Sequence, residues 1–138
     1  MRTLAQIEEC LTALLEKGPE AGDAATLLAL AEEVLERWVC ARGEQPTTDR
    51  REGFRLLALH RQGAREEPSF NACRESCREL VYHYNLLILQ PDGVRCDAQA
   101  QMMARLAMHL YLFVAGKLQV RGLGEFCCAS RPLRTAAE

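Results

Sequence analysis

Residues 98–121, AQAQMMARLAMHLYLFVAGKLQVR, are the stretch from which the fold follows. Apolar side chains recur there at the three- and four-residue spacing of a helix, and no segment of useful length in the chain alternates as a strand does. The most apolar part, Leu106 to Ala115, covers ten residues between Arg105 and Lys117, which is well short of a membrane span. We therefore expect a long, buried helix.

The same spacing predicts four more helices before this one. They cover about residues 3–17, 24–42, 50–62 and 70–90. The residues expected to cap the later helices are Asp23, Asp49 with Glu52, Ser69 and, for the last helix, Asp97. The helices at 70–90 and 98–121 are the longest and most apolar, so we expect them at the centre. The sequence predicts an all-α, single-domain bundle of about five helices over 1–124, with a short C-terminal tail over 125–138.

Length and composition are those of one globular domain. The chain has 138 residues, of which 49% are hydrophobic and 26% charged, so it can bury a core without disulfides or a metal. Glu8 and Glu9 interrupt any apolar run near the start, which argues against a signal peptide. Arginine far outnumbers lysine, as is typical of a GC-rich genome. We expect a bacterial, cytoplasmic protein without a cofactor.

The charges are unevenly distributed along the chain. The net charge of −2 argues against nucleic acid as a partner. Residues 1–36 hold two basic and eight acidic residues, a balance of −6, whereas 37–65 hold seven arginines and three acidic residues, a balance of +4. The favoured interpretation is an acidic hairpin that complements a neighbouring basic segment. The alternative is a surface for an acidic partner or nucleic acid near Arg50, Arg51 and Arg55.

Two of the seven cysteines, Cys73 and Cys77, lie four residues apart and therefore on one face of the predicted helix at 70–90. Leu80 and Leu87 continue the same apolar stripe, which favours packing in the core. Thiol or metal handling by the two cysteines is a second alternative function. Zinc needs further convergent ligands, and no second closely spaced Cys/His pair faces this one, so no metal site is predicted.

The remaining cysteines have different expected surroundings. Cys10 falls on an apolar stripe, and Cys96 precedes the expected cap of the last helix. Cys40 lies on a polar face and is the best candidate for a surface thiol. The adjacent Cys127 and Cys128 are expected to pack against an apolar groove.

One segment carries a possible catalytic pair. The sequence Arg78-Glu-Leu-Val-Tyr-His83 resembles the Arg-x4-His motif of HEPN-domain ribonucleases, which are small, dimeric helical proteins. The resemblance implies that His83 acts on an RNA 2′-hydroxyl and that Arg78 stabilises the phosphorane charge. Glu79 departs from the Asn, Asp or His that this family commonly has there. On a continuous helix Arg78 and His83 lie about 140° apart, so they converge only at a helix break or across a dimer.

Other familiar enzyme motifs are missing. The sequence has no HExxH, Walker loop, GxGxxG or GxSxG. A carboxylate-bridged di-iron bundle needs Glu three residues before His, and leucine occupies that position before each histidine, at Leu57, Leu80 and Leu106. The missing motifs therefore favour a protein without enzymatic activity over an enzyme.

The favoured function is binding. The two long helices hold more apolar surface than their neighbours can cover, and Leu86, Leu89, Leu112 and Phe113 are the residues expected to contact a partner helix or a second copy of the chain. The leucine-rich segment from Leu11 to Trp38 resembles, in composition, flagellar and type III export chaperones. The sequence predicts a chaperone-like or regulatory interaction protein, a homodimer with no membrane contact; the alternative is an HEPN-like ribonuclease or RNA-binding domain.

Overall fold

The computed structural model describes residues 1–122, and within that range it contains α-helices, two short 3₁₀ helices and no strand. The elements in chain order are α1 (Leu4–Lys17), η1 (Ala21–Asp23), α2 (Ala24–Ala41), α3 (Arg55–Gly63), η2 (Pro68–Cys73), α4 (Arg74–Leu89) and α5 (Cys96–Val120). The all-α bundle predicted from apolar spacing is confirmed. The expected tail over 125–138, including Cys127 and Cys128, lies outside the described residues.

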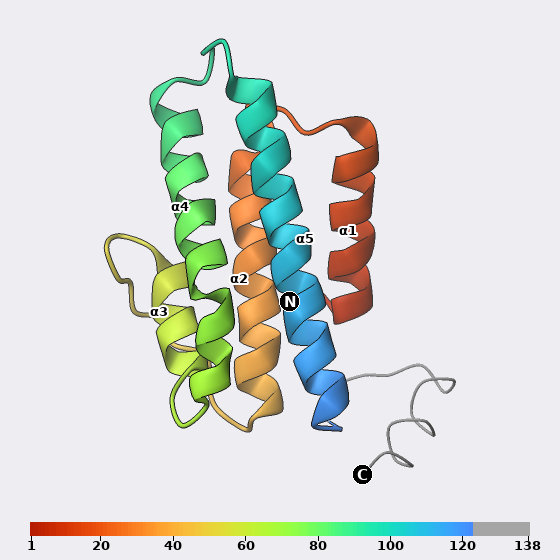
Figure 1. Ribbon diagram of the computed structural model, residues 1–138, viewed down its shortest axis with the longest axis vertical. Helices are drawn as coiled ribbons and strands as arrows, with labels where there is room; N and C mark the ends of the chain where they lie inside the picture. Colours follow the sequence, from red (N-terminus) through yellow and green to blue (C-terminus); the bar gives the residue numbers. More distant parts are fainter. Residues whose placement is uncertain (123–138) are drawn as a thin grey trace.

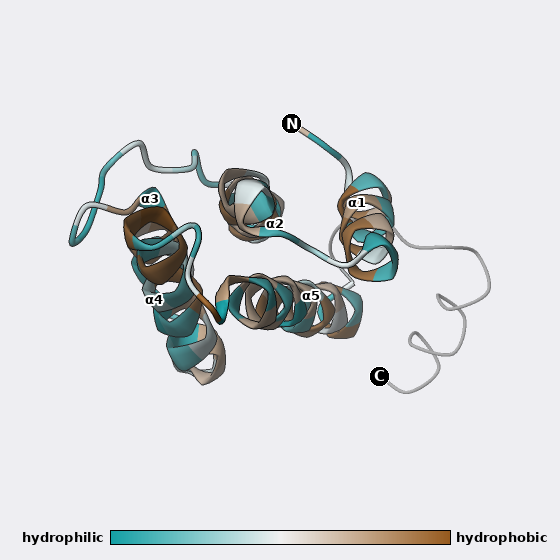
Figure 2. Cartoon of the chain, turned by 90° about the horizontal axis from the view of Figure 1, so that it is seen from above, coloured by the Kyte–Doolittle hydropathy of each residue, from teal (hydrophilic) through white to brown (hydrophobic). Residues whose placement is uncertain are grey.

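Four helices run side by side, and the short α3 lies against one flank (Figure 1). Seen from above, α2 and α5 occupy the middle, with α1 on one side and α3 and α4 on the other (Figure 2). The helix α5 packs against α1, α2 and α4, as a central helix should. The helix α4 packs mainly against α5 and leaves its outer face exposed, so α2 shares the centre with α5.

The third helix begins later than its sequence predicts, at Arg55 instead of about residue 50. Residues 51–54 form a tight turn in which the backbones of Arg51 and Phe54 exchange two hydrogen bonds of 3.0 Å. Glu52 and Gly53 both have positive φ in this turn, 54° and 85°, as a type I′ turn requires. The expected cap formed by Asp49 and Glu52 is therefore wrong, because this turn interrupts the helix path.

Two other expected caps are also wrong. Residues Pro68–Cys73 form a 3₁₀ helix, so α4 starts at Arg74 and the Ser69 hydroxyl donates to the Glu67 carboxylate instead of capping a helix. The helix α5 begins at Cys96, so Asp97 lies in its first turn. Asp23 does occupy the N-cap position of α2, but its carboxylate accepts from Lys17 and from the backbone of Glu20.

An aromatic stack joins α3 to α2 and to the start of α4. The rings of Trp38 and Phe70 lie 4.8 Å apart and nearly parallel, and the Trp38 indole donates to the Gly63 carbonyl at 2.9 Å. A Cβ atom on Gly63 would lie 2.8 Å from the Trp38 ring and 2.9 Å from that of Phe70. Only glycine allows this approach, and the contact fixes the end of α3 next to α4.

Within residues 1–122, none of the helices combines the length and the apolar character needed to cross a membrane.

Candidate functional site: an arginine-lined groove

Six arginine side chains gather on the flank of the bundle where α3 lies. They come from the loop before α3, from α3 and the turn after it, and from the first turns of α4: Arg50, Arg51, Arg61, Arg65, Arg74 and Arg78. They line two adjoining hollows, which share Arg51, Arg61 and Arg65. We call the two hollows together the arginine groove.

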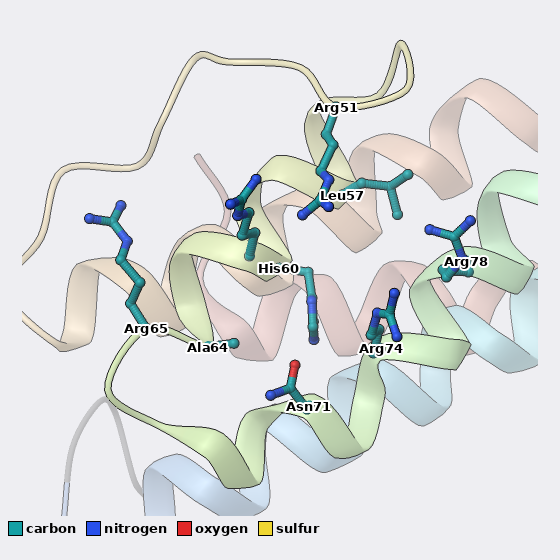
Figure 3. A pocket seen from close by; sticks show the side chains of 9 residues that line it. Arg51, Leu57, His60, Ala64, Arg65, Asn71, Arg74 and Arg78 are labelled. Atoms are coloured by element: carbon teal, nitrogen blue, oxygen red, sulfur yellow. The ribbon is translucent and has the colours of Figure 1, made fainter.

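The first hollow lies between α3 and the start of α4 and has a volume of about 180 Å³. Arg51 approaches it from the loop, Arg74 and Arg78 approach from α4, and His60 and Asn71 lie between them (Figure 3). The second hollow, of about 460 Å³, lies between α3 and the loop around residues 47–51. Because Arg61 and Arg65 belong to both hollows, they form the ridge that separates them.

Helical spacing explains why the arginines point the same way. Arg74 and Arg78 are four residues apart on α4, and side chains at that spacing lie on one face. Arg61 and Arg65 have the same spacing at the end of α3, where the Arg65 amide still bonds to the Gln62 carbonyl at 3.2 Å. Packing of α3 against α4 then brings the two pairs together.

Most of these guanidinium groups have no partner within the chain. Among residues 1–122, the side chains of Arg51, Arg61, Arg65 and Arg74 make no ion pair or hydrogen bond. Arginines elsewhere in the described chain do have partners. Arg2, Arg55 and Arg121 pair with the carboxylates of Glu33, Glu36 and Glu67, respectively. Arg37 donates to the carbonyl of residue 2, and Arg42 donates to two carbonyls. The groove therefore holds six arginines against two nearby carboxylates, those of Glu52 and Asp49, and carries an excess of positive charge.

Within the described chain, Arg50 and Arg78 are the two groove arginines with a hydrogen-bond partner. Arg50 Nη1 donates to the Gly53 carbonyl at 3.3 Å, whereas Arg78 has a carboxylate partner. Its Nη1 and Nη2 atoms donate to Glu52 Oε2 and Oε1 at 3.1 and 3.4 Å. This hydrogen-bonded pairing lowers the pKa of Glu52 below its ordinary value. Glu52 sits in the left-handed turn described above, so the turn holds a carboxylate at the mouth of the first hollow.

The wall of the first hollow supplies few chemically available groups. His60 is buried, stacks on Phe70 at 5.5 Å and has its Nε2 atom 3.2 Å from the Phe70 carbonyl. The Asn71 side chain is exposed and makes no hydrogen bond in the described part of the chain. Its amide can donate to a bound anion, whereas His60 is held by the core.

Cys73 and Cys77 lie behind this wall and are buried, as their apolar stripe predicts. The Cys73 thiol donates to the Phe70 carbonyl at 3.2 Å. The hydrogen bond from Cys77 lowers the pKa of Cys73, and the same contact, with burial, raises that of Cys77. Residues 1–122 contain no group of three or more His, Cys, Asp or Glu side chains that could hold a metal ion. The pair therefore packs in the core.

Cys10 and Cys40 lie where the sequence places them, whereas Cys96, predicted to precede the cap of the last helix, lies inside that helix. Cys10 is partly buried against the core, Cys40 is exposed on α2, and Cys96 is the first residue of α5.

The motif pair Arg78 and His83 is not brought together within one chain. The helix α4 runs unbroken through both residues, which places them about 140° apart around its axis. Arg78 belongs to the arginine groove, whereas His83 is half-buried with an unpartnered Nδ1 atom, and burial lowers its pKa. The two residues do not form a common site in a single copy.

The expected apolar contact residues have different surroundings. Leu89 and Leu112 are 77% and 57% exposed, and Leu86 is partly buried. Phe113 instead packs against the Phe70 ring at 5.7 Å and under the Lys117 ammonium, so it belongs largely to the core. Ile88, which belongs to the same predicted apolar surface, is 56% exposed. The sequence analysis missed two exposed apolar side chains, Tyr82 in the middle of α4 and Val94 in the turn between α4 and α5.

The sequence identified the basic region but only some of its residues. Arg50 and Arg51 line the groove, whereas Arg55 turns inward and pairs with Glu36 at 3.1 Å. Arg61 and Arg74 were missed, although each starts a pair of arginines four residues apart, a spacing that could have found them. Neither a family model, nor a curated protein, nor a solved structure matches this chain.

Proposed function

We propose that this protein is a binding module and that the arginine groove holds a phosphate-bearing partner. The observation that carries the proposal is the convergence of Arg51, Arg61, Arg65 and Arg74 on two adjoining hollows. None of these four side chains makes a hydrogen bond or a close ion pair within the described residues, although the charge of Glu52 acts on Arg51 and Arg74. A guanidinium presents a planar set of N–H donors that matches phosphate oxygens two at a time. Four such groups held together repel one another, and a bound anion relieves that repulsion.

The groove offers binding groups and no catalytic set. The ring of His60 is engaged by the Phe70 carbonyl, and the Cys73 thiol is only 2% exposed. The second hollow adds only the Thr47 hydroxyl and the exposed Asp49 carboxylate, and no nucleophile paired with a base is seen in the described lining of either hollow, so the arrangement favours holding a phosphate over transferring it. This favours the expected class, an interaction protein, over the ribonuclease alternative.

A titration with inorganic pyrophosphate tests the proposal. We expect backbone amide chemical shifts to change around Arg61, Asn71 and Arg74 and to saturate. The double variant Arg61→Ala/Arg74→Ala should lose the response, because it removes one guanidinium from α3 and one from α4. Arg95→Ala/Arg105→Ala removes the same charge from exposed positions outside the groove and should respond like the wild type.

Two outcomes would overturn the proposal. One is a wild-type spectrum that does not change at millimolar pyrophosphate. The other is an equal loss of response in the groove variant and the control variant, which would mean that the anion senses net charge and not the groove.

Self-association is a second candidate function, supported by the exposed apolar side chains at the end of α4. Ile88, Leu89 and Val94 are each more than half exposed around the α4–α5 turn, and so is Tyr82 about two helical turns earlier on α4. Exposed clusters of large apolar residues favour protein contacts. We propose a homodimer through this end. Sedimentation equilibrium should show a dimer that Ile88→Asp/Leu89→Asp converts to a monomer; a wild-type monomer at all concentrations would contradict it.

A further inference from the structure

The two hollows of the arginine groove are arranged for a linear polyanion. The first is bordered on α3 by Leu57, His60 and Ala64, and the second by Ala58 and Gln62, so they follow neighbouring faces of one helix. Arg61 and Arg65 stand between them and can contact an anion on either side. A single small anion fills one hollow, whereas a chain with regularly spaced negative charges can place one in each.

We infer that the occupant is single-stranded nucleic acid, bound through its phosphodiester backbone across the ridge of Arg61 and Arg65. This inference rests on the proposed function and names its ligand. It departs from the expectation drawn from the net charge of −2, because that value averages the acidic segment 1–36, with a balance of −6, and the arginines that line the groove.

The composition of the groove favours a nucleic-acid backbone over an acidic peptide. Peptide-binding sites obtain most of their affinity from buried apolar and aromatic anchors, but the only apolar side chains lining the two hollows are those of Leu57, Ala58 and Ala64. Interfaces with nucleic acid are more polar and much more positive. The lining has six arginines, one carboxylate at Asp49 and a few neutral polar groups. This strongly positive balance matches the second kind of partner.

The shape of the groove favours a single strand. Duplex DNA is stiff, with a persistence length of about 150 base pairs, so it does not bend around one helix. A flexible strand can follow the surface of α3 and place successive phosphates in the two hollows. Among the described residues, no Phe, Tyr or Trp side chain lines either hollow, and the buried His60 ring is already stacked on Phe70. Bases therefore have no free stacking platform, and binding reads the backbone without sequence preference.

Glu52 is an internal competitor for this ligand. Its carboxylate occupies the Nη1 and Nη2 atoms of Arg78 at 3.1 and 3.4 Å, the donors that a phosphate in the first hollow would use. An incoming strand must displace Glu52 from Arg78. Removing the charge of Glu52 therefore strengthens binding, whereas removing an arginine weakens it, and the two opposite effects distinguish a site from general attraction.

The test is fluorescence anisotropy of a labelled 20-nucleotide single strand, with uridine and thymidine homopolymers as separate arms, at several salt concentrations. If four arginines contact phosphates, the logarithm of affinity should fall with the logarithm of salt with a slope of about −3. Arg61→Ala/Arg74→Ala should weaken binding at least about tenfold and reduce the magnitude of the slope by about 1.4, which is about 0.7 for each lost contact. Glu52→Gln should strengthen binding severalfold.

Two control variants show whether the effect belongs to the groove. Arg95→Ala/Arg105→Ala makes the same charge change on exposed residues elsewhere. Arg131→Ala/Arg134→Ala makes the same charge change at two positions that lie outside the described residues. Both should bind as the wild type does. The groove arginines replaced here have no internal partners, so their removal leaves the fold intact, which circular dichroism checks.

The outcomes separate this inference from the proposed function. Pyrophosphate binding at the groove without strand binding, or a polyglutamate peptide that binds more tightly than the strand, would overturn the nucleic-acid assignment and leave the anion site standing. No binding of either probe would overturn both. Equal losses in the groove variant and a control variant, or a weaker Glu52→Gln, would overturn the placement of the strand.

Discussion

Two clusters of positive side chains lie on the same bundle and differ in whether their charges are satisfied. The first surrounds Trp38: the cationic groups of Arg42, Lys117 and Arg121 lie 5.6 to 5.8 Å from its ring centre. Arg42 also donates to the carbonyls of Gly63 and Arg65 at 2.8 Å, and Lys117 and Arg121 both contact the Glu67 carboxylate. We call Trp38, Gly63, Phe70, Glu67 and these three cations the Trp38 junction.

The arginine groove has the opposite character. Arg51, Arg61, Arg65 and Arg74 face two hollows without a carboxylate or carbonyl partner in the described chain. Arg42 and Arg61 are the same residue type close to α3, yet one holds the fold together and the other is available to a ligand. The comparison shows that an arginine's role follows from what already satisfies its donors, and each prediction below contrasts the two clusters.

The largest expected effect is at the centre of the Trp38 junction. Gly63→Ala places a Cβ atom 2.8 Å from the Trp38 ring, so the stack must shift, at a cost of about 3 kcal/mol in the free energy of unfolding. Gly116→Ala is the matched control, because Gly116 lies within α5 and nothing lies within 4 Å of a Cβ atom added there. This variant should raise the free energy of unfolding by about 0.5–1 kcal/mol. Urea unfolding measures both, and equal effects would contradict the packing described.

The next effect concerns the carboxylate of the junction. Hydrogen bonds from Ser69, then Lys117 and Arg121, hold the pKa of Glu67 at about 2, below its usual 4.5. The unfolded chain therefore binds this proton more readily. The contribution of the Glu67 carboxylate to the free energy of unfolding is complete above pH 4.5 and is lost as the pH falls toward 2.

Glu67→Gln should accordingly cost about 1–2 kcal/mol at pH 7. The stability difference between the variant and the wild type should shrink on acidification from pH 5 to pH 2. Urea unfolding over that range checks it, and a difference that stays constant with pH would refute the role of the carboxylate.

The smallest expected effect on stability comes from replacing one arginine by alanine in each of the two clusters. Arg42→Ala removes two hydrogen bonds to carbonyls and should cost about 1–2 kcal/mol. Arg61→Ala removes no internal bond and should change stability by less than about 0.5 kcal/mol. If thermal unfolding showed that both variants lose equally, the distinction between satisfied and available arginines would fail.

The architecture was readable from the sequence where apolar spacing is long and regular. The run from Leu106 to Ala115 predicts α5, and Gly18 and Gly43 mark real helix ends. The start of α3 was not readable, because Asp49 and Glu52 have cap-like spacing but Glu52 and Gly53 adopt positive φ in a turn. A spacing rule does not distinguish these two uses of the same residues.

The groove could be predicted only in part, because three separate segments build it. Arg50 and Arg51 are visible as a basic pair, but Arg61 and Arg74 meet them only after α3 packs against α4. The inward turn of Arg55 depends on Glu32 and Glu36 of α2, which are distant in sequence. Charge pattern located the region, and tertiary packing decided which of its arginines remain unpaired.

The most direct test of the account is urea unfolding of the wild type and of Arg61→Ala/Arg74→Ala, each with and without the single-stranded 20-mer. Without the strand the two proteins should be equally stable. With the strand at a hundred times the dissociation constant of the wild type, the wild type should gain about 2.7 kcal/mol, and the variant, which binds at least about tenfold more weakly, should gain no more than about 1.4 kcal/mol. A variant that is destabilised without the strand, or that gains as much from it as the wild type, would contradict the claim that these arginines serve binding and not the fold.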